Sequence, residues 1–276
     1  MSRNKFLKKT WKEFIYGGHL LSLGASGIIY TTIQLLGLKN SWLLLMVAYL
    51  LSQIIYSFDH IVGAKNDIVK RKASQPILIV YLILFLLTTI FLNNWKVSCA
   101  SFSIIIFGLC YPLLFKKFTK KIPAFKNIFV ALIWSLSPVV LVLFKYSLDF
   151  NNVFLLLLLF IFLRWFLNTS FFDMKDILAD KKDSLKTIPI ILGEKKTLTF
   201  FHLLNLFSFL PLILAIYYKV LSSFSIGLCV FYLYSFYYLL RSSYAKKNIP
   251  FLSYVMADGE YLLWPLAIYI AKIILC

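Results

Sequence analysis

Long apolar stretches alternate with short polar ones along the whole chain. A helix needs about 20 apolar residues to cross the hydrocarbon core of a bilayer, and nine segments reach or nearly reach that length. The pattern therefore predicts an all-α, polytopic membrane protein built as a nine-transmembrane-helix bundle. The nine segments begin near His19, Ser41, Pro76, Val97, Asn127, Val153, Leu198, Leu221 and Pro250.

The composition supports a membrane protein and excludes an ordinary soluble fold. Of the 276 residues, 61% are hydrophobic, 18% are aromatic and only 14% are charged, and the mean hydropathy is +0.83. A soluble core of this size does not need so much apolar surface. Because no fixed-period repeat and no linker of biased composition interrupts the pattern, we expect a single domain over residues 1–276 that begins with a basic segment, 1–17.

Lys and Arg gather on one predicted side of the membrane. If the N-terminus is cytoplasmic, the cytoplasmic segments 1–17, 58–75, 116–126, 173–196 and 241–249 hold 23 of the 29 basic residues, whereas the turns on the other side hold four. Since cytoplasmic loops carry an excess of Lys and Arg, we expect an N-terminus in the cytoplasm and a bacterial inner membrane as the location. The same dispersal explains the net charge of +18 by orientation and attraction to anionic lipids, without a nucleic-acid partner.

The few acids of the chain form two clusters in the second and fourth of these cytoplasmic segments. Asp59 and Asp67 make the first cluster, and Asp173, Asp176 and Asp180 belong to the second. The last three are spaced i, i+3, i+7, so they share a helix face if the preceding apolar helix continues through them. Mg²⁺ prefers carboxylate oxygens together with phosphate oxygens, which predicts a metal site with all five as ligands. The alternative interpretation is a solvated loop face.

Basic residues lie beside both acidic clusters. The candidates for binding phosphate are Lys70, Arg71, Lys116, Lys117 and Lys186. Carboxylates with nearby Lys and Arg suit a diphosphate bridged by Mg²⁺, because metal and cations together neutralise the phosphate oxygens. Orientation of the loops alone is the alternative, and it accounts for part of this set.

Polar residues also fall within the apolar segments. Arg164 and Asn168 continue a polar stripe toward the second acidic cluster, and Asp258 and Glu260 lie in the last segment. Charged residues inside a bilayer are costly and face the bundle interior. Two roles remain open: Arg164, Asn168 and Asp258 contact substrate, or Arg164 forms a structural pair with Asp258 or Glu260.

The stretch DMKDILADKKDSLKTIPIILGEKKT resembles the second aspartate motif of the UbiA superfamily of intramembrane prenyltransferases, which reads DxxDxxxD followed by a basic residue, Thr-x-Pro and Leu-Gly. A second stretch, YPLLFKKFTKKIPAFKNIFVALIWS, resembles the family segment between the fourth and fifth helices, and it makes Tyr111 a candidate substrate contact. The positions that match the second motif are Asp173, Asp176, Asp180, Lys186, Thr187, Pro189 and Gly193.

The first aspartate motif departs from the family pattern, NxxxDxxxD followed by Arg-Pro. At that spacing this chain has Asp59, Gly63 and Asp67, with Gln75 before the proline. Asp59 replaces the Asn and provides an alternative metal ligand, whereas Gly63 removes the middle carboxylate. The departure bears on a second metal ion and on the range of substrates.

The resemblance implies Mg²⁺-dependent transfer of a prenyl group from an isoprenyl diphosphate to an aromatic or other lipophilic acceptor within the lipid bilayer. It makes the five acids catalytic residues and metal ligands. Two other functions stay open: a membrane terpene synthase or cyclase that acts on the prenyl diphosphate alone, and a non-catalytic polyprenyl- or lipid-binding protein. The candidate substrate-binding residues are Lys70, Arg71, Tyr111, Lys116, Lys117, Arg164, Asn168, Lys186 and Asp258.

Overall fold

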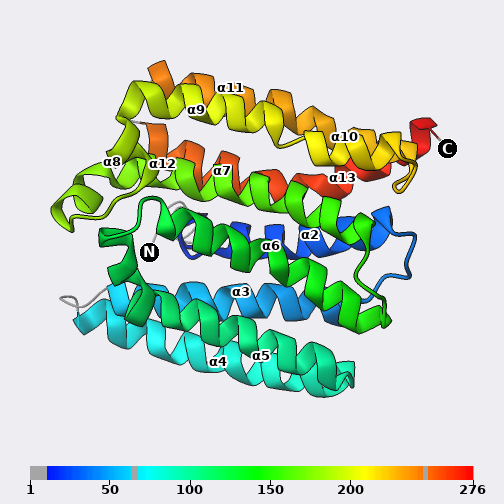
Figure 1. Ribbon diagram of the computed structural model, residues 1–276. Coiled ribbons are helices and arrows are strands. Elements are labelled where there is room, and N and C mark those ends of the chain that lie inside the picture. The colour runs from blue at the N-terminus through cyan, green and yellow to red at the C-terminus, as the bar shows by residue number, and fades with distance from the viewer. Residues whose placement is uncertain (1–10, 64–67, 245–247, 276) are drawn as a thin grey trace, which may run out of the picture.

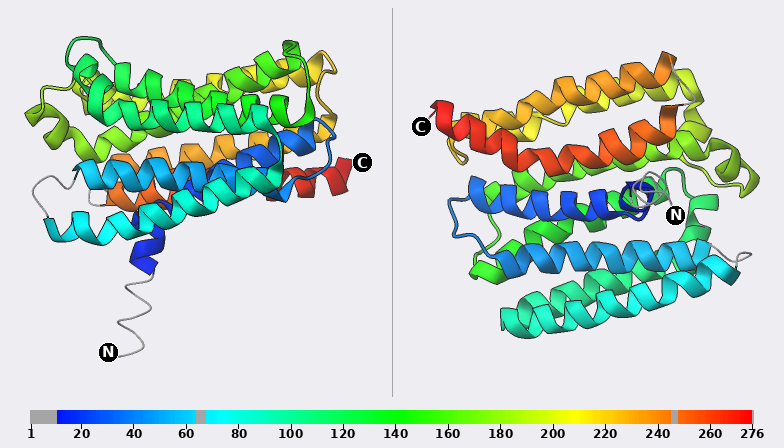
Figure 2. Two further views of the ribbon diagram at one scale, coloured as in Figure 1. Left: turned by 90° about the horizontal axis from the view of Figure 1, so that it is seen from below. Right: turned by 180° about the vertical axis from the view of Figure 1, so that it is seen from behind.

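The computed structural model describes residues 11–63, 68–244 and 248–275, and its regular structure in these ranges is helical. The long helices lie side by side with their axes roughly aligned (Figure 1). Figure 2 shows the same packing from below and from behind. The N-terminal half contributes α2 (His19–Leu35), α3 (Trp42–Gly63), α4 (Ile68–Leu92), α5 (Trp95–Cys110) and α6 (Phe125–Tyr146).

The C-terminal half lies against α2 and α6 and is completed by several short helices. Its long helices are α7 (Asn152–Lys182), α9 (Glu194–Phe207), α10 (Leu210–Tyr217), α11 (Val230–Tyr244) and α13 (Asp258–Leu275). The short elements of this half are α8 (Ile188–Leu192), η3 (Ser223–Cys229), α12 (Ile249–Phe251) and η5 (Leu252–Ala257). In the N-terminal half, η1 (Tyr111–Phe115) and η2 (Lys116–Lys120) connect α5 to α6.

Within the described residues, seven helical segments are long and apolar enough to cross a membrane. The protein is therefore an all-α, polytopic, integral membrane protein. Two of the nine expected segments fall outside this set: α2 has 17 residues, and α13 carries Asp258, Glu260 and Lys272. The seven segments are Trp42–Val62, Gln75–Leu92, Trp95–Lys120, Phe125–Tyr146, Asn152–Lys182, Glu194–Tyr217 and Ser223–Tyr244.

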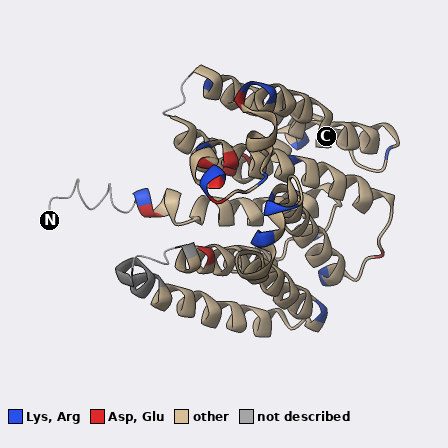
Figure 3. Cartoon of the chain, turned by 60° about the vertical axis from the view of Figure 1, so that its left-hand side comes forward, with Lys and Arg blue, Asp and Glu red and all other residues tan. Residues whose placement is uncertain are grey.

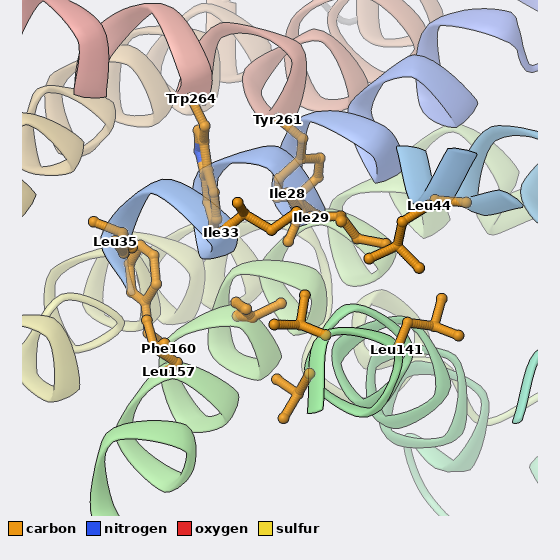
Figure 4. Packing of buried hydrophobic residues seen from close by; sticks show 14 of the residues in the cluster. Ile28, Ile29, Ile33, Leu35, Leu44, Leu141, Leu157, Phe160, Tyr261 and Trp264 are labelled. Carbon is orange, nitrogen blue, oxygen red and sulfur yellow. The ribbon is translucent and has the colours of Figure 1, made fainter. Parts of the chain in front are cut away.

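A buried hydrophobic core joins α2, α3, α6, α7 and α13. Figure 4 shows Ile28, Ile29 and Ile33 of α2 beside Tyr261 and Trp264 of α13. The two helices approach closely because α2 presents glycine there: a Cβ on Gly27 would lie 2.4 Å from the Tyr261 carbonyl oxygen. Small residues permit such close backbone approach between membrane helices.

The two acidic segments are more helical than expected. Residues 173–182 are the last turns of α7, so the helix does continue through Asp173, Asp176 and Asp180. Asp59 belongs to the last turns of α3, and α4 already begins at Ile68, before the apolar run. Loops were expected here because the residues are polar, but a helix that extends past the bilayer keeps its backbone hydrogen bonds whatever its side chains.

Charged residues concentrate at one end of the bundle. Figure 3 brings forward the end that carries α8 and α12, and acidic and basic residues are seen together there. The end of α3, the start of α6, the end of α7 and the start of α13 meet at this end. They bring the acidic clusters and the polar residues of the last segment into one region.

Candidate functional site

Two cavities open side by side at the charged end of the bundle. The first, of about 210 Å³, lies among α2, α3, α5, η1 and α6. The second, of about 180 Å³, lies among α2, α3, α6, α7 and α13. They share a wall, so groups on that wall face both cavities. The shared residues are Leu21, Tyr56, Lys126, Val130 and Trp134.

The predicted acids are divided between the cavities. Asp59 lines the first cavity together with Tyr111. Asp173 and Asp176 line the second. Asp180 is buried on the same face of α7, and its Oδ2 accepts no hydrogen bond from the described residues. The structure therefore brings three of the predicted acids to the two sides of one shared wall, while Asp180 lies farther along α7 and Asp67 lies outside the described residues.

Asp173 is fully buried and both of its oxygens are occupied. Lys126 donates to Oδ1 at 2.5 Å, and the Asn127 side-chain amide donates to Oδ2 at 2.8 Å. A carboxylate held by a lysine and a buried amide has its orientation fixed. Asp173 thereby fixes Lys126 in turn, whose side chain keeps 26% of its surface exposed.

Lys126 is a site residue that sequence reasoning missed. It stands in the first turn of α6, after Ala124, whose backbone is left-handed with φ 55°. The Ala124 amide donates to the Lys186 carbonyl oxygen at 2.8 Å, and the Lys186 amide donates to the Thr119 carbonyl oxygen at 2.9 Å. These two bonds tie the start of α6 to the chain after α7, so that Lys126 faces Asp173. Its position between a polar loop and an apolar helix is typical of a site residue. Four other lysines lie within ten residues before it, so the sequence alone does not single it out.

The other predicted cations have different partners. Lys116 bonds to Asp183 at 3.1 Å with both side chains about half exposed, and this hydrogen bond lowers the pKa of the Asp183 carboxyl group. The Lys186 ammonium donates to the Lys121 carbonyl oxygen at 3.4 Å, and that of Lys117 lies 5.8 Å from the centre of the Phe118 ring. Among the described residues, Lys126 is the one lysine that lines either cavity. The side chains of Lys70 and Arg71 lie outside the described part.

The polar residues of the spans separate into two groups. Asn168 and Asp258 line the second cavity, and the Asn168 amide donates to the Asp258 carboxylate at 3.3 Å. Arg164 instead forms an ion pair with Glu260 at 2.6 Å, with both side chains at most 2% exposed. Of the two roles left open for Arg164, the geometry corresponds to the structural pair, and the partner is Glu260.

The donor set fits Mg²⁺ by its chemistry. No three of the described His, Cys, Asp and Glu side chains converge as a metal-binding group. Mg²⁺, however, is typically held by one or two carboxylates plus phosphate oxygens. Asp59 and Asp176 face the cavities from opposite sides of the shared wall, and Asp176, which Lys175 contacts at 2.5 Å, keeps 40% of its side chain exposed. These two acids supply hard oxygen donors at positions that a diphosphate can reach.

The family model described as the UbiA prenyltransferase family matches residues 20–257. A UbiA homologue from Aeropyrum pernix is 12% identical, with a TM-score of 0.68 over 92% of this chain and 97% of its own. A UbiA homologue from Archaeoglobus fulgidus, bound to GPP and Mg²⁺, is 15% identical, with a TM-score of 0.59 over 92% and 99%. A structure of digeranylgeranylglyceryl phosphate synthase is 18% identical, with a TM-score of 0.58 over 97% and 99%. Among curated proteins, none matches.

Proposed function

The chain belongs to the UbiA prenyltransferase family, and from this premise we propose that it transfers a prenyl group from an isoprenyl diphosphate to an aromatic or other lipophilic acceptor, with Mg²⁺ as cofactor. The observation that carries the proposal is the pair of cavities on the two sides of Lys126, with Asp59 on one side and Asp176 on the other. Solved structures of the same fold with GPP or DMAPP and Mg²⁺ support it.

The proposed membrane arrangement is a single domain of nine spans with a cytoplasmic N-terminus. It adds α2 and the segment 249–275 to the seven apolar segments, because both run through the bundle and pack on each other. The excess of Lys and Arg at the charged end supports a cytoplasmic site. A bacterial inner membrane is the location we propose.

The shared wall supplies the diphosphate contacts. Lys126 faces both cavities and is held by Asp173 and Asn127, so it offers a fixed positive charge where the diphosphate enters. We assign Asp173 to this positioning role, in place of the metal contact expected from the motif. Asp59 and Asp176 would hold Mg²⁺, with Asp67 and Asp180 as further acids of the two clusters. When bound, Mg²⁺ supplies positive charge that stabilises the leaving pyrophosphate.

The reaction breaks the bond between C1 of the prenyl group and the diphosphate oxygen, and the electron pair leaves with pyrophosphate. C1 then bonds to an electron-rich carbon of the acceptor, which loses a proton. Asp258 is placed to take that proton, because it lines the second cavity and Asn168 orients it. The allylic cation needs protection from water, and the aromatic walls formed by Tyr56 and Trp134 contribute to it.

Two cavities favour transfer over cyclisation. A cyclase acting on the prenyl diphosphate alone needs one chamber, whereas a transferase needs room for a donor and an acceptor. The first cavity has fewer charged and polar residues on its wall, and its lining by Ile55, Phe129 and Ile133 suits the prenyl chain. The second has Asn168, Asp176 and Asp258 on its wall and suits a polar acceptor head. We therefore place the donor in the first cavity and the acceptor in the second.

The test measures release of pyrophosphate by the purified protein in lipid nanodiscs, with geranyl diphosphate, Mg²⁺ and a membrane lipid extract as the source of acceptor. We expect release that requires both the extract and Mg²⁺ and that chelation by EDTA abolishes. Asp176→Asn is expected to lose most of the activity. Asp183→Asn is the matched control, because Asp183 contacts Lys116 outside the cavities.

Three results would contradict the proposal. Release of pyrophosphate with a hydrocarbon or terpenol product in the absence of extract would identify a cyclase. Full activity in excess EDTA would exclude the Mg²⁺ role. A wild-type protein that binds the diphosphate without turnover, and whose binding is unchanged in Asp176→Asn, would be a non-catalytic binder.

A further inference from the structure

Trp134 stands at the inner end of both cavities. Its side chain lines the first, the second and a third, deeper crevice. The indole stacks on Trp165 with 5.6 Å between ring centroids, and Trp165 stacks on Tyr261 at 4.4 Å. Trp165 and Tyr261 are each 1% exposed. The ring of Trp134 is therefore supported from α7 and α13 and does not swing freely.

The crevice beyond Trp134 is almost filled. Its volume is about 10 Å³, which is at the limit for a single water molecule. Its walls nevertheless include small side chains from three helices: Ala25 of α2, Ala48 and Ser52 of α3, and Ser137 of α6. Trp134 is the one described residue that lines both this crevice and the first cavity. The second cavity shares Trp134 and Trp165 with the crevice.

We propose that Trp134 is the floor of the prenyl cavity and limits the donor to a short isoprenyl diphosphate, of geranyl length or less. The inference rests on the proposed function and deepens it by naming the donor class. The proposal concerns the Trp134 side chain and its distance from Lys126 along α6.

The depth of the first cavity supports this limit on the length of the prenyl chain. Lys126 and Trp134 are eight residues apart on α6, which corresponds to about 12 Å along the helix axis. An isoprene unit has four main-chain bonds where a peptide residue has three, so it extends by about 4.5 to 5 Å on the scale of an extended peptide. With the diphosphate at Lys126, two units fit above the indole, and a third runs into it.

The test compares binding of diphosphate analogues whose reactive oxygen is replaced by sulfur, so that no acceptor is needed. Dimethylallyl, geranyl, farnesyl and geranylgeranyl S-thiolodiphosphates are titrated with Mg²⁺ onto the purified full-length protein by calorimetry. For the wild type we expect affinity to rise from dimethylallyl to geranyl and to fall at least about tenfold for geranylgeranyl, because overfilling a packed site is unfavourable. For Trp134→Ala we expect the geranylgeranyl analogue to bind at least as tightly as the geranyl analogue.

Two further variants separate the floor from a general loss of packing. Phe129→Ala enlarges the same cavity nearer its mouth, so it is expected to keep the wild-type order of affinities. Trp134→Leu removes less volume and serves where the alanine variant does not fold. Trp134→Leu is expected to bind the farnesyl analogue more tightly than the wild type does.

The outcomes distinguish this inference from the proposed function. Equal affinity of the wild type for geranyl and geranylgeranyl analogues overturns the floor and leaves the prenyltransferase proposal intact, and so does an unchanged order in both Trp134 variants. Failure of all four analogues to bind overturns the proposed function, and the floor with it. A shift in order caused equally by Phe129→Ala assigns chain length to cavity volume in general and also overturns the role of Trp134.

Discussion

The ion pair of Arg164 and Glu260 allows a quantitative test of what holds the bundle together. The guanidinium donates to Glu260 from Nε at 3.0 Å and from Nη2 at 2.6 Å. Its remaining bonds go to Asn205 and Ser208, through Nη1, and to Ser235, through Nη2. The cluster thus links α7, α9, α11 and α13 at buried positions.

The perturbation is Arg164→Met, which leaves the Glu260 carboxylate buried with Ser235 as its remaining hydrogen-bond partner among the described side chains. Breaking a buried pair by removing one charge costs about 3–5 kcal/mol. That is a large part of a typical folding free energy of about 5–15 kcal/mol. Replacing both charges removes the unpaired carboxylate, so Arg164→Met/Glu260→Leu is expected to be more stable than Arg164→Met alone. The expected coupling energy is at least about 2 kcal/mol.

The assay is reversible unfolding in detergent micelles, followed by circular dichroism, for the wild type, both single variants and the double variant. Binding of geranyl S-thiolodiphosphate is measured on the same samples. Because Arg164 lines neither cavity among the described residues, affinity in the folded double variant should stay close to that of the wild type. The reasoning is refuted if Arg164→Met costs less than about 1 kcal/mol, or if the two single costs add in the double variant.

Two further predictions concern the site and the helix packing. Lys126→Met is expected to weaken binding of the geranyl analogue by about tenfold to a hundredfold, the value of a hydrogen bond to a charged group; exposed Lys121→Met is the control, and equal affinities in the two variants would exclude the role of Lys126. Gly27→Ala is expected to cost about 1–3 kcal/mol, because its Cβ would lie 2.4 Å from the Tyr261 carbonyl oxygen. Gly259→Ala, whose Cβ meets its nearest neighbour at 3.7 Å, is expected to unfold like the wild type, and a Gly27→Ala protein of unchanged stability would contradict the packing argument.

The helical fold could be predicted from the sequence because membrane helices are local. Each apolar run satisfies its own backbone within one segment, so its existence is readable without knowing its neighbours. The ends of the helices were less readable: α7 continues to Lys182 and α4 begins at Ile68, in polar sequence where hydropathy carries no signal. The spacing of Asp173, Asp176 and Asp180 predicted their shared helix face for the same local reason.

Partners far apart in the sequence could not be assigned. Arg164 and Glu260 are 96 residues apart, and the sequence offered both Asp258 and Glu260 as partners. The choice between these two partners depends on which residues of α13 face α7. Tertiary packing determines that orientation. Lys126 could not be identified as a site residue for a different reason. The positive-inside rule alone predicts lysines in this loop. Its contact with Asp173 and its place on the cavity walls distinguish it from the other lysines of that loop.

The charges on the cavity walls bear on the proposed role of Mg²⁺. Among the described residues, Asp59, Asp173, Asp176 and Asp258 line the two cavities against Lys126 alone. Lys175 offsets one more acid by its contact with Asp176. Among the described side chains of the walls, acids outnumber cations, so these side chains alone do not attract a free diphosphate strongly. Lys116 and Lys186 have partners outside the cavities, so neither adds its charge to these described walls. A Mg²⁺–diphosphate complex would bring positive charge of its own, and we propose that Lys126 then positions the diphosphate.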